Sequence, residues 1–175
     1  MRLNMGAGFN KLDGFTNVDR ESACKPDLLL DLDSVPFWPF QDNSIDEIRA
    51  HHVLEHLVHF KTFFQEAYRV MKHGATLDIR VPHHLSDEQF GDPTHVRAVT
   101  PQQLQLLDKD FCEECRRMNA ANSQLATYWD VDFELVSVNT ALKPRWMADT
   151  DIQNVLDSFV NVAAEVGMML RCRKS

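Results

Sequence analysis

The sequence has 175 residues with 18 basic and 26 acidic side chains, so its formal net charge is −8. This length suits one domain, over residues 1–175, and the apolar fraction of 44% is ordinary for a globular protein. The acidic balance argues against a nucleic-acid partner, whose phosphates select a basic surface. No apolar run approaches the ~20 residues that span a bilayer, and polar residues interrupt the N-terminus where a signal peptide would be apolar. We therefore expect a cytoplasmic protein without a membrane partner.

The four cysteines indicate reduced thiols, as is usual in a cytosolic protein. Cys112 and Cys115 form one Cys-x-x-Cys pair, but no second pair completes a tetrahedral zinc site. We interpret this pair as incidental thiols on a helix and predict no metal there.

In chain order, the first elements are short strands. Residues 2–5 and 15–18 predict two strands joined through a Gly-Ala-Gly turn that ends at Gly8. So few residues separate Gly8 from Asp19 that any helix between these strands is a single turn or absent.

The next segments predict a strand–helix–strand unit. The apolar run of residues 27–32 predicts a strand buried on both faces, and residues 45–50 predict a fourth strand. Residues 59–71 have apolar side chains at helical spacing, and Gly74 is typical of the residue that closes a helix. A fifth strand follows at residues 75–81, so we expect a mostly parallel sheet.

The second half is less regular. Residues 83–95 are polar and show no period, whereas Thr100 and Pro101 are typical of a helix start and predict a helix to about Leu107. Residues 111–124 predict a further helix with a polar face. Strands are predicted at residues 133–142 and 166–173, paired antiparallel.

The ends of four successive predicted strands carry groups suited to a ligand: Gly6-Ala7-Gly8, Asp19, Asp31-Leu32 and His51-His52. Open α/β sheets bind ligands at the carboxyl ends of their strands. Glycines let the backbone approach a ligand closely, and an acid at the second strand end can accept hydrogen bonds from ribose hydroxyls. This pattern predicts a site for a nucleoside with a charged tail.

Three motifs in this order resemble those of class I S-adenosylmethionine-dependent methyltransferases. They are Leu3-Asn-Met-Gly-Ala-Gly8, Trp38-Pro-Phe-Gln-Asp-Asn-Ser-Ile-Asp46 and His52-Val-Leu-Glu-His56. The chain looks most similar to small bacterial and phage methyltransferase-11-like members, over residues 2 to about 108. The resemblance implies an α/β fold with a Rossmann-like doubly wound sheet, mostly parallel, seven strands with the last antiparallel. It also implies S-adenosylmethionine as the cofactor.

The resemblance also implies where the cofactor would bind. The methionine end would contact Asn4, Gly6, Ala7 and Gly8. The ribose would contact Asp19, the adenine would contact Asp31 and Leu32, and the transferred methyl would lie beside His51 and His52.

Three residues of the irregular segment are candidate catalytic groups: His83, Asp92 and His95. A histidine can take a proton at neutral pH, and an aspartate can orient it. The same residues could instead hold a divalent metal, or simply tie down a structural loop. Glu55 and His56 could be catalytic by residue type, but we interpret them as the start of a helix.

The leading hypothesis is methyl transfer to a small-molecule or sugar (glycan) acceptor, with His83 or His95 as the base. The alternative is a non-catalytic S-adenosylmethionine-binding module, a regulatory or assembly partner. This alternative is favoured by Asn4, which stands where an acid is more frequent, and by the lack of lid helices before the first strand. Nucleic-acid methylation ranks third, and the oligomeric state is left open.

Overall fold

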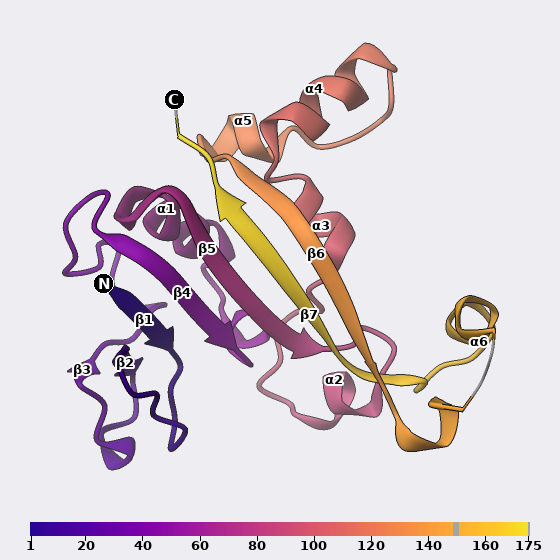
Figure 1. Ribbon diagram of the computed structural model, residues 1–175, viewed down its shortest axis with the longest axis horizontal. Helices are drawn as coiled ribbons and strands as arrows, with labels where there is room; N and C mark the ends of the chain where they lie inside the picture. The colour runs from indigo at the N-terminus through magenta and orange to yellow at the C-terminus, as the bar shows by residue number, and fades with distance from the viewer. Residues whose placement is uncertain (149–150, 175) are drawn as a thin grey trace.

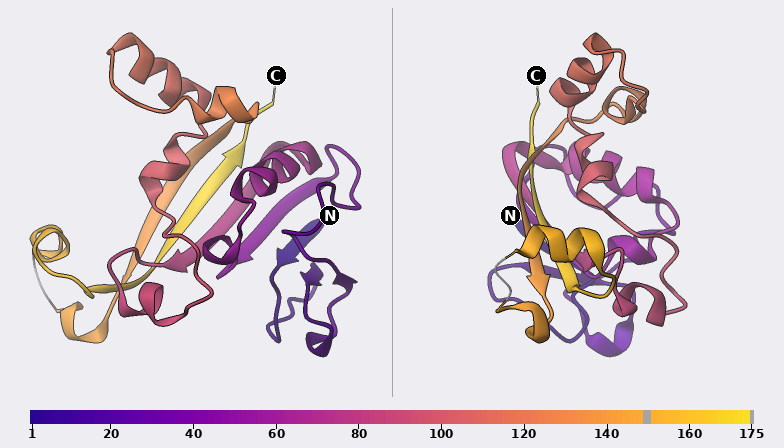
Figure 2. Two further views of the ribbon diagram at one scale, coloured as in Figure 1. Left: turned by 180° about the vertical axis from the view of Figure 1, so that it is seen from behind. Right: turned by 90° about the vertical axis from the view of Figure 1, so that its right-hand side faces the viewer.

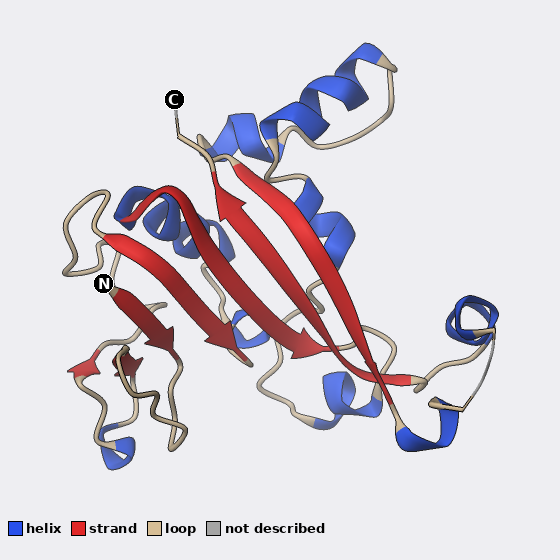
Figure 3. Ribbon diagram, viewed as in Figure 1, coloured by secondary structure: helices blue, strands red, loops and turns tan. Residues whose placement is uncertain are grey.

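A seven-stranded sheet forms the centre of the computed structural model, which describes residues 1–148 and 151–174 (Figures 1 and 3). Its strand order is β3-β2-β1-β4-β5-β7-β6. The pairs from β3 to β5 are parallel, whereas β7 runs antiparallel to both β5 and β6. This topology confirms the predicted α/β, doubly wound sheet. The strands are β1 (Arg2–Met5), β2 (Thr16–Asp19), β3 (Leu28–Leu29), β4 (Ile45–His51), β5 (Met71–Pro82), β6 (Phe133–Leu142) and β7 (Ala163–Cys172).

The helices are short, and α1, α3 and α4 lie on one side of the sheet (Figure 2). On that side Ile48 and Leu77 pack with Phe63 and Phe64 of α1 in a continuous apolar core. No helix in the described residues is long and apolar enough to cross a membrane. The helices are α1 (Phe60–Val70), α2 (Asp87–Gly91), α3 (Pro101–Gln105), α4 (Lys109–Arg117), α5 (Leu125–Trp129) and α6 (Ile152–Ser158), and the 3-10 turns are η1 (Ser22–Cys24), η2 (Leu54–His56) and η3 (Pro144–Trp146).

Local signals predicted several elements correctly. The chain passes from β1 to β2 without a helix, as the short spacing required. Thr100 caps α3 in a reciprocal arrangement with Gln103, with Pro101 in the first turn. Residues 133–142 form β6 as predicted.

The prediction for residues 27–32 was wrong in extent and burial. Only Leu28 and Leu29 form β3, and Leu29 is 59% exposed. β3 pairs with β2 alone at the edge of the sheet, and the chain continues from Leu30 through turns rather than a covering helix. Because no helix packs on one face of this edge strand, the side chain of Leu29 on that face is exposed to solvent.

Gly74 does not close α1. The helix ends at Val70, and β5 begins at the next residue. The register between β4 and β5 shifts between Ile45 and Glu47, and Gly74 lies opposite this irregularity with φ of 80°. The glycine therefore permits a bulge in a strand. The predicted helix over residues 111–124 also ends early, at Arg117.

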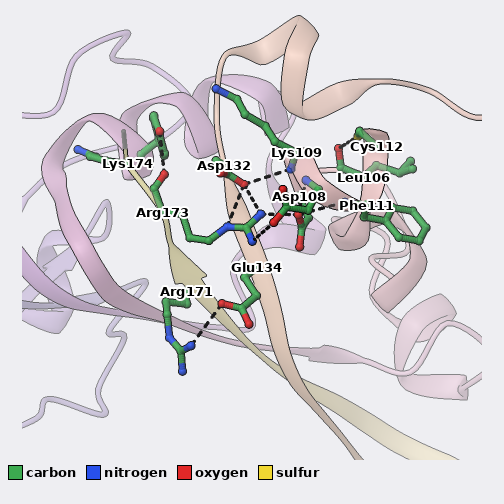
Figure 4. A network of polar contacts seen from close by, with 12 residues as sticks. Leu106, Asp108, Lys109, Phe111, Cys112, Asp132, Glu134, Arg171, Arg173 and Lys174 are labelled. Carbon is green, nitrogen blue, oxygen red and sulfur yellow. Dashed lines mark hydrogen bonds and ion pairs between the residues drawn. The ribbon is translucent and has the colours of Figure 1, made fainter. Parts of the chain in front are cut away.

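Arg173, the residue after β7, joins three carboxylates from two segments of the chain (Figure 4). It pairs with Asp108, which caps α4, with Asp110 at 2.7 Å and with Asp132 at 2.7 Å. The side chains of Asp108 and Asp132 are 15% and 18% exposed. Removing the cation would therefore leave two poorly hydrated carboxylates close together.

Arg173→Ala is expected to lower the free energy of unfolding by about 2–3 kcal/mol, measured by urea denaturation. The matched control is Arg171→Ala, two residues earlier on β7. Among the described residues Arg171 forms one ion pair, with Glu134 at 3.3 Å, and both side chains are well exposed. Its effect should stay below about 0.5 kcal/mol. Equal losses in the two variants would contradict this account.

Candidate functional site

An open cleft lies at the carboxyl ends of the first strands, with about 610 Å³ of empty space that includes open solvent. The segments after β1, β2, β3 and β4 contribute to it, as does the chain after β5, as expected for the ligand site of an open α/β sheet. The lining residues are Gly6, Asp19, Arg20, Leu30, Asp31, Leu32, Asp33, Val53, His56, Leu57 and Thr94.

The glycine turn after β1 packs tightly against the cleft wall. Gly6 has φ of 63°, and a Cβ atom there would lie 2.4 Å from Cγ2 of Val53. Only glycine fits both the left-handed backbone and the available space. The turn therefore places bare backbone, rather than a side chain, at the cleft.

Asp19 is fixed by two backbone amides. Gly8 donates to its Oδ2 at 2.7 Å, and Glu21 donates to its Oδ1 at 2.8 Å. Each carboxylate oxygen has a second lone pair, so Asp19 can still accept two hydroxyl donors from a ligand. This is the geometry that binding of a ribose diol requires.

The segment after β3 supplies two acidic side chains, Asp31 and Asp33, and two apolar ones. A hydrogen bond from the Ser34 hydroxyl, at 2.7 Å, lowers the pKa of Asp31, so this carboxyl is ionised at neutral pH. Leu30 and Leu32 provide apolar wall on either side of it. Together they suit a planar base with an exocyclic amine.

Gly6, Asp19, Asp31 and Leu32 are the predicted cofactor residues that line the cleft. Asn4 and Ala7 instead hold the turn in shape. The Asn4 side chain donates to the Asn10 carbonyl and to Asn17, and the Ala7 amide donates to the Val18 carbonyl.

The two histidines at the end of β4 lie outside the lining of this cleft. His51 accepts from Arg49 at 3.1 Å and contacts Asp78 at 2.8 Å. His52 has φ of 54° and forms ion pairs with Glu55 and Glu165. The contact with Glu55 raises the pKa of His52 although burial opposes this.

The candidate catalytic residues do not form one cluster. Nε2 of His95 lies 3.9 Å from Oδ2 of Asp92. The ring of His83 lies 4.3 Å from that of His84, tilted by 38°, and His83 lines a different cleft, beside Pro101. Burial lowers the pKa of His83.

Sequence reasoning did not place His56 in the site, although its side chain also lines the cleft. η2 places His56 at the wall, and its ring lies 4.7 Å from that of His95. Nδ1 of His56 lies 3.0 Å from Oγ1 of Thr94. The signal was present in the His52-Val-Leu-Glu-His56 motif, but the interpretation of Glu55 and His56 as a helix start did not place His56 at the cleft.

Comparison with known proteins agrees with this geometry. Residues 14–79 match a family described as a methyltransferase domain. No curated protein sequence matches the chain. Among solved structures, an S-adenosylmethionine-dependent methyltransferase from Archaeoglobus fulgidus is 16% identical with a TM-score of 0.61, over 97% of this chain and 85% of that one.

Two further structures share the fold. A putative methyltransferase from Bacillus halodurans is 15% identical with a TM-score of 0.60, over 99% of this chain and 92% of the other. A possible histamine N-methyltransferase from Thermotoga maritima is 14% identical with a TM-score of 0.58, over 97% of this chain and 80% of the other.

The sheet order, the antiparallel β7 and the cleft at the strand ends define the class I methyltransferase fold. The match of residues 14–79 to a methyltransferase domain agrees with this fold. Two of the three solved structures named above are described as S-adenosylmethionine-dependent methyltransferases. The residues that line the cleft suit this cofactor. Gly6 presents backbone rather than a side chain to the cleft, Asp19 has free lone pairs, and Leu30 and Leu32 offer apolar surface.

Proposed function

We propose that this chain transfers the methyl group of S-adenosylmethionine to a hydroxyl of a small molecule or sugar (glycan). The observation that carries the proposal is the cleft itself, in which Asp19 and the glycine turn adjoin a wall containing His56 and Thr94. The acidic net charge of −8 supports an acceptor other than nucleic acid.

Each part of the cleft would have one task. The cofactor supplies a methyl group activated by a positively charged sulfur. Asp19 would hold the ribose, and Asp31 with Leu32 would hold the adenine. Precise positioning of acceptor and methyl then provides most of the rate enhancement.

A hydroxyl acceptor must also lose a proton, and His56 is the group at the cleft that can take it. Thr94 contacts its Nδ1 and donates its own hydroxyl hydrogen to Asp92 at 2.7 Å. Asp92 would thus act as a positioning residue through Thr94, while His95 packs behind His56.

The test is methyl transfer from labelled cofactor to a panel of sugars, glycans and small hydroxyl compounds, with amines, DNA and RNA in parallel. His56→Ala should lower turnover about 100-fold and change cofactor affinity less than about threefold. His73→Ala is the control, since His73 is exposed and contacts only Lys174 among the described residues.

Methylation confined to DNA or RNA would overturn the proposal. Cofactor binding without transfer to any acceptor would support the non-catalytic module instead.

A further inference from the structure

Three side chains that could bind a metal meet beside the cofactor cleft. Glu55 and His56 come from η2, after β4, and His95 comes from the segment after α2. One carboxylate oxygen and one nitrogen from each histidine lie within 4.8 Å of one another. The fold therefore brings together a carboxylate and two imidazoles from segments far apart in the sequence.

Glu55 is fully buried, and neither of its carboxylate oxygens accepts a hydrogen bond from any residue that the structure describes. Among the described residues it forms one ion pair, with His52, whose Nδ1 lies 3.4 Å from Oε1. A buried carboxylate without hydrogen-bond donors is costly, and such groups are normally paired or bound to a metal. The exposed His52 is thus the single counter-charge to Glu55 in the part of the chain that the structure describes, and a second cation would offset its burial.

The hydrogen bonds of His95 fix its tautomer. Its Nδ1 lies 2.9 Å from the carbonyl oxygen of Gln89. A carbonyl can only accept, so Nδ1 carries the hydrogen. In the neutral ring Nε2 then has a free lone pair.

The same reasoning applies to His56. The Thr94 hydroxyl donates its single hydrogen to Oδ1 of Asp92, so it can only accept from Nδ1 of His56. Nε2 of His56 is therefore also the unprotonated nitrogen of a neutral ring.

We propose that Glu55, His56 and His95 bind a divalent metal ion of the Zn²⁺ type. Two histidines and one glutamate form a recognised zinc ligand set that leaves a coordination position open. Metal-binding histidines typically donate their other ring nitrogen to a carbonyl or a carboxylate. Gln89 accepts directly from His95, and Asp92 acts through Thr94 on His56.

This site differs from the one that the sequence suggested. His83 takes no part, and the Cys112–Cys115 pair is not involved. Because His56 also lines the cleft, the ion would lie at the cleft wall. If the proposed function holds, the ion would lower the pKa of an acceptor hydroxyl at the open coordination position. His56 would then serve as a metal ligand in place of the role of base proposed above.

The test is titration of the untagged, chelator-treated chain with Co²⁺, followed by its visible absorption and by competition with Zn²⁺. We expect one ion per chain. Glu55→Gln and His95→Ala should each weaken Co²⁺ binding at least about 100-fold, and Thr94→Val about 10-fold through loss of His56 orientation. His73→Ala should bind as the unchanged chain does.

Circular dichroism shows which variants fold, and Glu55→Gln should fold at least as well because it removes a buried charge. Undiminished Co²⁺ binding in folded Glu55→Gln and His95→Ala would overturn the proposal. A thiolate-to-cobalt absorption band would also overturn it by placing the ion at Cys112 and Cys115. S-adenosylmethionine binding, measured separately on the same protein, tests the proposed function independently.

Discussion

Gly6→Ala is expected to lower the free energy of unfolding by about 3 kcal/mol. A left-handed backbone costs a non-glycine residue about 1–2 kcal/mol, and overpacking adds about 1–3 kcal/mol. The added Cβ would lie 2.4 Å from Cγ2 of Val53, a buried, β-branched side chain with little freedom to turn away. Urea denaturation measures the loss.

Gly8→Ala is the matched control, because Gly8 has φ of 50° but nothing within 4 Å of its added Cβ. It should show only the backbone cost, about 1–2 kcal/mol. The double variant Gly6→Ala with Val53→Ala should be more stable than the sum of its single changes predicts. Identical losses of unfolding free energy in Gly6→Ala and Gly8→Ala would show that the contact with Val53 contributes nothing to the effect at Gly6.

Asp19→Asn is expected to weaken S-adenosylmethionine binding between about 10- and 100-fold, since hydrogen bonds to a charged group contribute about 1.5–3 kcal/mol. The amide has only one acceptor oxygen, so it cannot hold Gly8, Glu21 and two ribose hydroxyls as the carboxylate can. Isothermal titration calorimetry measures the change. S-adenosylhomocysteine should lose affinity by the same factor, because it has the same ribose.

Asp46→Asn is the control for charge. Asp46 lies on β4, where it pairs with Lys72 at 2.6 Å and with the N-terminal amine. It does not line the cleft. The affinity of the Asp46→Asn variant for S-adenosylmethionine should therefore equal that of the unchanged chain. A folded Asp19→Asn variant with full affinity would mean that the ribose is not bound at Asp19.

Much of the sheet could be predicted from local sequence, because strand burial and helix capping depend on nearby residues. The capping box at Thr100 and the short passage from Gly8 to Asp19 are examples. Gly74 was misinterpreted because a positive φ suits either a helix end or a strand bulge. Only the pairing of β5 with β4 distinguishes the two.

The candidate site was predictable where it follows strand ends and unpredictable where distant segments meet. Asp19 and Asp31 line the cleft because parallel strands end at one edge of the sheet. The contact of His56 with Thr94 and His95 depends on how the chain after α2 folds back. That segment has no periodicity, so its path could not be deduced from spacing.

A crystal structure of the chain with S-adenosylhomocysteine tests the central claim most directly. The account predicts the ribose hydroxyls on the Asp19 carboxylate, with the adenine against Leu30 and Leu32 and the Gly6 backbone beside the amino-acid portion. A nucleoside bound elsewhere on the protein, with Asp19 making no contact to its sugar, would contradict it.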